Sequence, residues 1–226
     1  MAQPNASALE QFALAAGCDE IDLAQMALLI AAAEYPDLDA KEELRALDSL
    51  AAGASRSLGE ETDPLARVNR LSEYLFDEVG FRGNREDYYD PRNSFLNEVL
   101  SRRLGIPITL FLVYIEVGKR LGVPLVGVGM PGHFMVRISS GEEGLMIDPF
   151  HRGILLSQKE CAQRLQEVAG AGVPWDRSYL APVSNRGLIE RILLNLRGIY
   201  GRRHDQPRAL RAAEWLLALQ SRSPPE

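Results

Sequence analysis

The sequence predicts an α+β fold in which one buried helix packs against a small antiparallel sheet, with further helices on both sides of it along the chain. Residues 109–121 are apolar on nearly every face, which is typical of a buried helix. Three short β-rich runs follow, at residues 124–128, 134–138 and 145–147, and Gly and Pro separate them. Amphipathic helical patterns precede and follow this central stretch.

The first 80 residues predict four amphipathic helices. Aspartates stand where helix N-caps are expected, at Asp22, Asp39 and Asp63, and Pro64 follows the last of them. Residues 53–63 contain two glycines and predict a polar loop before the fourth helix. We therefore expect residues 1–80 to form an N-terminal helical region that packs on the core.

Residues 80–92 form a loop dense in charged and aromatic side chains. Its tyrosines, Tyr89 among them, either pack on the surface or form the rim of a cleft, because loops carry a large share of binding residues. Asn93 is predicted to cap a helix at 94–103. Asn97 either reaches the site or is a hydrogen-bonded structural amide. Asn93, Asn97 and Tyr89 are the candidate binding residues.

Two titratable residues lie at the ends of predicted strands. His133 begins the second strand, after the Met130-Pro131-Gly132 turn, and Asp148 ends the third. Neighbouring antiparallel strands can bring the two side chains together. A carboxylate that orients an imidazole is the supporting half of a nucleophile–His–Asp triad. We therefore take His133 and Asp148 as candidate catalytic residues.

This order of elements resembles the transglutaminase-like superfamily, and more narrowly its SirB-type branch. The matching segments are residues 93–100 (NSFLNEVL), 103–108 (RLGIPI), 131–134 (PGHF) and 147–150 (IDPF). The resemblance implies a papain-like core, at residues 81–156, with a catalytic Cys at the start of the central helix. In such a site the helix dipole and a nearby protonated His lower the pKa of the thiol.

The nucleophile is missing from this chain. Residues 105–108 read Gly-Ile-Pro-Ile where the superfamily has its Cys, and the two cysteines, Cys18 and Cys161, lie far from this stretch. Without the nucleophile, the remaining His and Asp of a triad can only orient a bound group and interact with it electrostatically. The sequence therefore indicates a degenerate transglutaminase-like module that binds a protein or peptide partner or regulates it, rather than an enzyme.

Three alternatives use the same residues. In a hydrolase or acyltransferase, Thr109 would be the nucleophile and His133 its base, although a Thr at a helix start is commonly an N-cap. His133 could instead transfer protons without a nucleophile. Finally, His133, Asp148 and His151 are residue types that bind zinc. Because no pattern of the family supports such a site, we expect no metal and no cofactor.

Residues 157–226 predict a C-terminal helical region. Ser157 and Glu160 form a capping box. A helix at 185–200 and a last helix after Asp205 resemble one tetratricopeptide unit, which follows the core in the SirB-type branch. A single pair forms no superhelical groove, so we expect it to cap the core.

The composition limits the function classes. The net charge is −6 with an isoelectric point near 5.3, which argues against nucleic acid or an anionic membrane as partners. Two widely separated cysteines make a disulfide framework improbable and indicate a reducing compartment. Neither a signal peptide nor a membrane-spanning run is evident. We therefore expect a cytoplasmic protein of undetermined oligomeric state.

Overall fold

The central helix α6 (Pro107–Arg120) organises the structure, a computed structural model that describes residues 4–139, 145–170 and 172–221. It begins two residues earlier than predicted, because Pro107 suits the first turn, where its missing N–H costs no helical hydrogen bond. The predicted burial is confirmed: only Ile115, Lys119 and Arg120 of this helix are not buried. Tyr114 donates its hydroxyl hydrogen to the carbonyl of Val68, which ties α6 to α4 (Pro64–Ser72).

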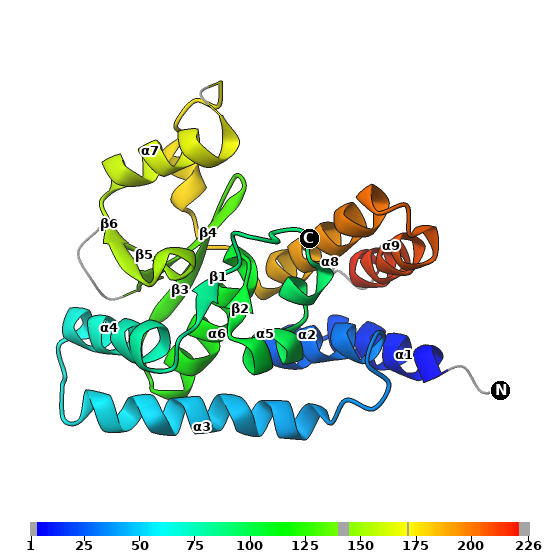
Figure 1. Ribbon diagram of the computed structural model, residues 1–226, viewed down its shortest axis with the longest axis horizontal. Helices are drawn as coiled ribbons and strands as arrows, with labels where there is room; N and C mark the ends of the chain where they lie inside the picture. Colours follow the sequence, from blue (N-terminus) through cyan, green and yellow to red (C-terminus); the bar gives the residue numbers. More distant parts are fainter. Residues whose placement is uncertain (1–3, 140–144, 171, 222–226) are drawn as a thin grey trace.

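A four-stranded sheet packs against α6, in the order β3-β4-β5-β6 with every pair antiparallel. The strands are β3 (Leu125–Met130), β4 (His133–Ile138), β5 (Met146–Asp148) and β6 (Ile154–Leu156). Side chains alternate along β4. Phe134 and Val136 belong to the core cluster that contains α6, whereas Met135 joins Cys161 of α7 (Gln158–Ala169) in a second cluster. The sheet therefore lies between α6 and α7 (Figure 1).

A two-residue turn connects β3 to β4 and sets the position of His133. Met130 pairs with His133, so only Pro131 and Gly132 form the turn. Gly132 adopts φ +74°, a conformation that favours glycine. Pro followed by a positive-φ Gly is typical of a type II turn.

The N-terminal helices are α1 (Pro4–Ala16), α2 (Leu23–Ala32), α3 (Ala40–Leu58) and α4 (Pro64–Ser72). The predicted caps are confirmed, because Asp22, Asp39 and Asp63 each accept hydrogen bonds from backbone N–H groups of their helices. α3 runs beneath α4 and α6 along the lower edge of Figure 1. The predicted loop at 53–63 is wrong at its start: Gly53 lies inside α3, where the Tyr74 ring packs against it. Tyr74 belongs to a π-helical turn, η1 (Glu73–Glu78), that continues α4.

Short elements lead into α6. β1 (Arg82–Gly83) and β2 (Leu104–Gly105) form a parallel pair, and between them lie a 3-10 turn, η2 (Pro91–Ser94), and α5 (Leu96–Arg102). Asn93 was predicted to cap a helix at 94–103, which is wrong. Asp90 caps η2 with its side chain, and α5 starts after Phe95 without a side-chain cap.

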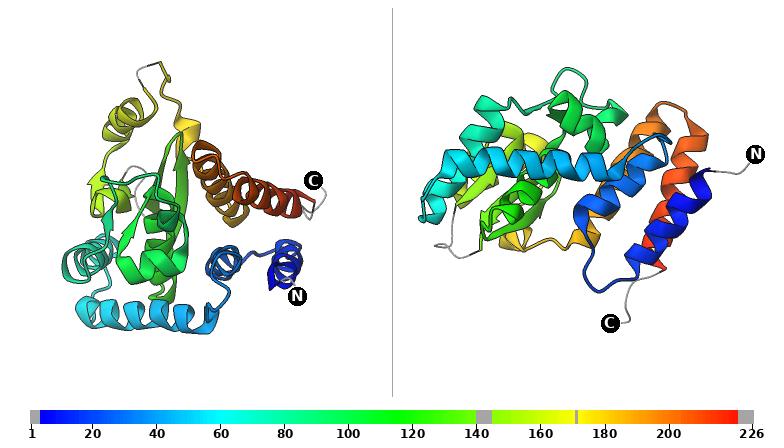
Figure 2. Two further views of the ribbon diagram at one scale, coloured as in Figure 1. Left: turned by 45° about the vertical axis from the view of Figure 1, so that its right-hand side comes forward. Right: turned by 90° about the horizontal axis from the view of Figure 1, so that it is seen from below.

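The C-terminal part contains η3 (Pro149–His151), η4 (Arg177–Leu180), α8 (Asn185–Arg202) and α9 (Gln206–Gln220). The capping box of Ser157 and Glu160 and the N-cap Asp205 are confirmed. η4 is a 3-10 turn capped by the side chain of Asp176. α8 and α9 pack against each other, and α9 also contacts α1, so helices from both ends of the chain lie together (Figure 2).

One hydrophobic cluster joins helices from both ends of the chain to the central helix, for example through Phe12 of α1, Tyr114 of α6 and Trp215 of α9. The observed mixture of helices and small sheets agrees with the predicted α+β class. None of the helices in the described ranges combines the length and apolar composition needed to cross a bilayer.

Candidate functional site

The structure brings His133 and Asp148 together in the protein interior. His133 is the first residue of β4 and Asp148 the last of β5, as predicted. Nε2 of His133 lies 2.9 Å from Oδ2 of Asp148, and the side chains are 1% and 0% exposed. The two atoms are not aligned as a hydrogen bond, and Nε2 of His133 has no other partner in the structure as described.

Two further side chains complete what we call the Asp148 cluster: His133, Asp148, His151 and Arg164. Nδ1 of His151 lies 2.7 Å from the same carboxylate oxygen, Oδ2. Nε of Arg164 lies 3.6 Å from it, and Nη1 of Arg164 lies 3.5 Å from Nε2 of His151. The other oxygen, Oδ1, accepts hydrogen bonds from the backbone N–H groups of Phe150 and His151. Oδ1 of Asp148 thus caps η3, and Oδ2 lies close to the side chains of His133, His151 and Arg164.

The carboxyl group is held in its ionised form. Burial by itself raises the pKa of Asp148, but interactions with His133 and His151 outweigh burial and keep this pKa below its usual range. A carboxylate at this position is therefore charged at neutral pH. Its environment matches the orienting member of a His–carboxylate pair.

The Asp148 cluster is nearly closed to solvent. Only His151 and Arg164 are partly accessible, each with a side chain that is 19% exposed. The ring of Phe150 stands edge-on to His133, with centroids 6.2 Å apart, and the ring of His151 lies 5.8 Å from that of His133. Since His133 shares its face of β4 with Met135, it points toward the α7 side of the sheet. The pair does not open into solvent.

Thr109 lies in the first turn of α6, at its third position, rather than at the helix start that was predicted. Its hydroxyl accepts a hydrogen bond from the backbone N–H of Ile106 at 3.1 Å and donates to the carbonyl of Asn93 at 2.7 Å. The residue is buried. This geometry ties α6 to η2 and favours the capping role of Thr109 over a nucleophilic one.

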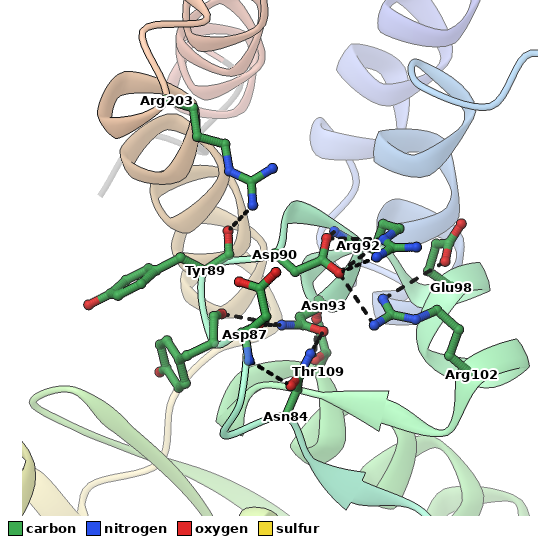
Figure 3. Close-up of polar contacts among 11 residues, drawn as sticks. Asn84, Asp87, Tyr89, Asp90, Arg92, Asn93, Glu98, Arg102, Thr109 and Arg203 are labelled. Atoms are coloured by element: carbon green, nitrogen blue, oxygen red, sulfur yellow. Dashed lines mark hydrogen bonds and ion pairs between the residues drawn. The ribbon is translucent and has the colours of Figure 1, made fainter.

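Asn93 lies at the centre of a polar network in the 84–93 loop (Figure 3). Its Nδ2 donates to the carbonyls of Asp87 and Tyr88, and its Oδ1 accepts from Asn84. Asn93 is fully buried, so these contacts describe a residue that orders the loop. The structure joins Asn93 to Thr109 but to no member of the Asp148 cluster.

The other two candidate binding residues lie on different elements. The Oδ1 atom of Asn97 is buried on α5 and has no hydrogen-bond partner among the described residues. Tyr89 is half exposed; the guanidinium of Arg202 lies 4.3 Å from its ring centroid, and its carbonyl accepts from Arg203. Tyr89 is thus a surface residue of the loop that contacts the C-terminal end of α8.

Neither cysteine is placed as a nucleophile. Cys18 is exposed after α1, and Cys161 is buried on α7 with its thiol 4.0 Å from the sulfur of Met135. Burial, reinforced by the charge of Asp148, raises the pKa of Cys161 to about 11. The thiol therefore stays protonated at neutral pH, in contrast to an activated cysteine.

Sequence reasoning missed the role of two residues in this cluster. Arg164 is on α7, and no local signal connects it with Asp148. His151 was considered only as a metal ligand. The Asp148-Pro149 pair is an N-cap followed by Pro, which predicts a helical turn that returns the side chain of His151 toward Asp148.

Comparison with protein families places most of the chain in one of them. Residues 41–194 match the model described as the Transglutaminase-like superfamily. This range begins in α3 and ends in α8, so it includes α6, the sheet and the Asp148 cluster. No solved structure is significantly similar to the chain.

Curated proteins also match the chain. A "UPF0162 protein" of Xylella fastidiosa (strain 9a5c) is 40% identical over 213 residues, covering 91% of this chain and 74% of that protein. A "UPF0162 protein" of Vibrio cholerae is 32% identical over 205 residues, covering 88% and 76%. "F-box only protein 21" of Mus musculus is 41% identical over 102 residues, which is 42% of this chain and 16% of that protein.

Proposed function

We propose that this chain, which belongs to the transglutaminase-like superfamily and to the UPF0162 family, is a degenerate member without covalent catalysis. It works as a binding or regulatory module. The narrower assignments are part of this proposal: the SirB-type branch, and α8 and α9 as one tetratricopeptide-like pair. The partner class is a protein or peptide.

The burial of the His133–Asp148 pair is the observation that carries this proposal. A triad must present its imidazole to the substrate carbonyl, within hydrogen-bond reach of the transferred proton. His133 is 1% exposed and Asp148 is 0% exposed. In this conformation an ester or amide cannot reach either side chain. The pair instead holds β4, β5 and η3 together.

The missing nucleophile supports the same conclusion. The start of α6 carries Pro107 and Ile108, both buried, where the superfamily has its Cys. The Thr109 hydroxyl is engaged by Asn93 and Ile106, and an engaged capping hydroxyl is a poor nucleophile. Cys161 is a buried thiol with a raised pKa.

The similarity to F-box only protein 21 fits a module that is used inside other chains. There, the matching segment occupies 16% of a longer protein. This match is what a module that recurs as part of longer chains would produce.

A substrate screen tests the proposal against the hydrolase or acyltransferase alternative. The wild-type protein is assayed with aryl esters, peptide amides, and a glutamine peptide plus a primary amine. We expect no turnover above the rate without protein. Turnover that Thr109→Val abolishes in a folded protein would establish the Thr109 mechanism. Turnover that survives Thr109→Val but not His133→Gln would establish proton-transfer catalysis by His133. Either outcome refutes the proposal.

The folded state of the variant needs its own control. Thr109→Val removes a capping acceptor and leaves the carbonyl of Asn93 unpaired, so it should lower the free energy of unfolding by about 1–3 kcal/mol. Thr62→Val is the matched control because Thr62 is exposed, and a change near zero is expected there. An equal loss in both variants would contradict the capping role.

A further inference from the structure

We infer that the Asp148 cluster is a binding site for one divalent transition-metal ion of the Zn²⁺ class, with His133, Asp148 and His151 as its protein ligands. Nε2 of His133, a carboxylate oxygen of Asp148 and a ring nitrogen of His151 all lie within 4.8 Å of one another. Two imidazoles and a carboxylate form a ligand set that Zn²⁺ accepts, with a remaining position for water or another ligand. This site is independent of the proposed function, since an ion here could stabilise a binding module as well as an enzyme.

The ring nitrogen Nε2 of His133, which has no hydrogen-bond partner among the described residues, is the second observation that points to a ligand. Nε2 is buried, has no aligned hydrogen-bond partner, and yet lies 2.9 Å from Oδ2 of Asp148. A buried ring nitrogen without a partner is costly. If Nε2 carries a lone pair, it also faces the lone pairs of a carboxylate, and a cation between these atoms would satisfy both.

Two of the three separations between ligand atoms lie close to those around a bound ion. Nε2 of His133 and Nδ1 of His151 lie 2.9 and 2.7 Å from Oδ2. Around a tetrahedral Zn²⁺ with bonds near 2.0–2.1 Å, ligand atoms stand about 3.3 Å apart. His151 is best able to move outward, because it is partly exposed and ends the one-turn helix η3. Asp148 is already fixed by the two backbone N–H groups that bind its other oxygen.

Arg164 is the feature that opposes the ion. Its guanidinium lies 3.6 Å from Oδ2 of Asp148, and it also donates to Nε2 of His151 at 3.5 Å. When Nδ1 of His151 binds a metal, the remaining proton of its neutral ring sits on Nε2, facing this donor. Arg164 must then turn toward Glu167, whose carboxylate already lies 2.8 Å from Nη1. The positive charge of Arg164 therefore weakens the site.

This inference departs from the expectation of no metal that the sequence supported. The sequence indicated that His133 and Asp148 meet, but it did not indicate that His151, separated from Asp148 by Pro149 and Phe150, returns to the same carboxylate. The turn η3 and the pairing of β4 with β5 supply that proximity.

The test uses the whole chain, stripped with a chelator and titrated with Zn²⁺ alone in competition with a chromophoric chelator. All samples carry Cys18→Ser, which removes the exposed thiol as a ligand. We expect one ion per chain with a dissociation constant in the micromolar range or below. His151→Gln should weaken binding at least tenfold, and Arg164→Met should strengthen it. His204→Gln is the matched control, because His204 is exposed and outside the cluster, and it should bind as the parent does.

Two readouts without enzymatic activity complete the test. Saturating Zn²⁺ should raise the melting temperature of the parent by mass action but not that of His151→Gln. Co²⁺ bound to the parent should show ligand-field bands without the thiolate charge-transfer band that coordination by Cys161 would produce. Failure of the parent to bind, equal binding by His151→Gln, weaker binding by Arg164→Met, or a thiolate band would each overturn the assignment.

Discussion

At the scale of single residues, the buried charge of Asp148 makes stability depend on acid pH. The folded state lowers the pKa of this carboxyl. Its contribution to the free energy of unfolding is therefore complete at pH values above the unfolded pKa of about 3.9, and it is lost as the pH falls below that pKa. Removing one partner of a buried ionic cluster costs about 3–5 kcal/mol. We expect Asp148→Asn to lose about that amount of unfolding free energy at pH 7 and progressively less relative to the wild type as the pH falls toward 3.

Urea unfolding monitored by tryptophan fluorescence between pH 7 and pH 3 measures this difference. Asp37→Asn is the matched control, since Asp37 is exposed, and it should stay within about 0.5 kcal/mol of the wild type throughout. A constant gap between the wild type and Asp148→Asn across the whole range would show that the charge of Asp148 contributes nothing.

The two cysteines should differ strongly in reactivity. Cys18 is exposed, whereas Cys161 is buried with its pKa raised to about 11. Because the thiolate is the reacting species, iodoacetamide at pH 8 should modify Cys18 at least a hundredfold faster than Cys161. Peptide mass spectrometry after timed quenching reports both sites, and in urea the two rates should converge. Native labelling of Cys161 first would contradict the buried environment of this thiol.

The sequence predicted the principal pair of the candidate site but not its surroundings. His133 and Asp148 stand at strand ends next to Gly and Pro, so their positions follow from local turn signals. Arg164 reaches Asp148 only because α7 folds back over the sheet, which is a non-local event. The burial of the pair was equally unpredictable, since it depends on how Phe150 and α7 cover it. The functional roles of His133, Asp148 and Thr109 therefore stay predictions.

At the scale of elements, the contact between α3 and η1 depends on the missing side chain of Gly53. A Cβ atom at position 53 would lie 1.8 Å from the hydroxyl oxygen of Tyr74 and 2.5 Å from its ring carbon Cζ. Alanine normally stabilises a helix interior by about 1 kcal/mol relative to glycine. Here we expect Gly53→Ala to destabilise the protein by about 1–3 kcal/mol, because the rigid ring must move.

A double-mutant cycle isolates this contact. In a Tyr74→Ala background, Gly53→Ala should become neutral or stabilising, as measured by chemical denaturation. Gly198→Ala on α8 is the matched control, because no atom lies within 4 Å of its Cβ position, and it should stabilise the wild type by up to about 1 kcal/mol. A loss at position 53 that persists without the Tyr74 ring would rule out the clash.

Elements with local signals were the most predictable. The caps at Asp22, Asp63 and Asp205 were correct because an N-cap is decided by a few neighbouring residues. Gly53 suggested a loop, since glycine weakens a helix and the residue that requires it, Tyr74, is distant in sequence. Asn93 was given the role of a cap, whereas its side chain bonds to the loop that precedes it.

At the scale of the whole molecule, Arg186 links helices from the two ends of the chain. It lies on α8 and donates to the carbonyl of Leu219 on α9 at 2.7 Å and to that of Ala16 on α1. Hydrogen bonds from a charged donor are worth about 1.5–3 kcal/mol. We expect Arg186→Met to lower the free energy of unfolding by that amount while Arg197→Met, an exposed position on the same helix, has little effect.

Equilibrium urea unfolding tests this with two probes, far-ultraviolet circular dichroism and tryptophan fluorescence. The probes should give coincident transitions in the wild type, because one hydrophobic cluster extends from α1 to α9. If Arg197→Met lowered the free energy of unfolding as much as Arg186→Met does, the hydrogen bonds from Arg186 to Leu219 and Ala16 would be unimportant for stability. The division into regions at 1–80, 81–156 and 157–226 stays a prediction.

The packing of α1 against α9 has a consequence for how the protein is made. About 190 residues separate the end of α1 from the start of α9, so at about 5–20 residues per second a ribosome needs roughly 10–40 s to deliver the second helix after the first. Throughout that interval Phe12, which lies 4.7 Å from Trp215 in the finished protein, lacks its aromatic partner. During translation α1 can therefore pack on α2 at once, whereas its contacts with α9 form only after α9 has emerged.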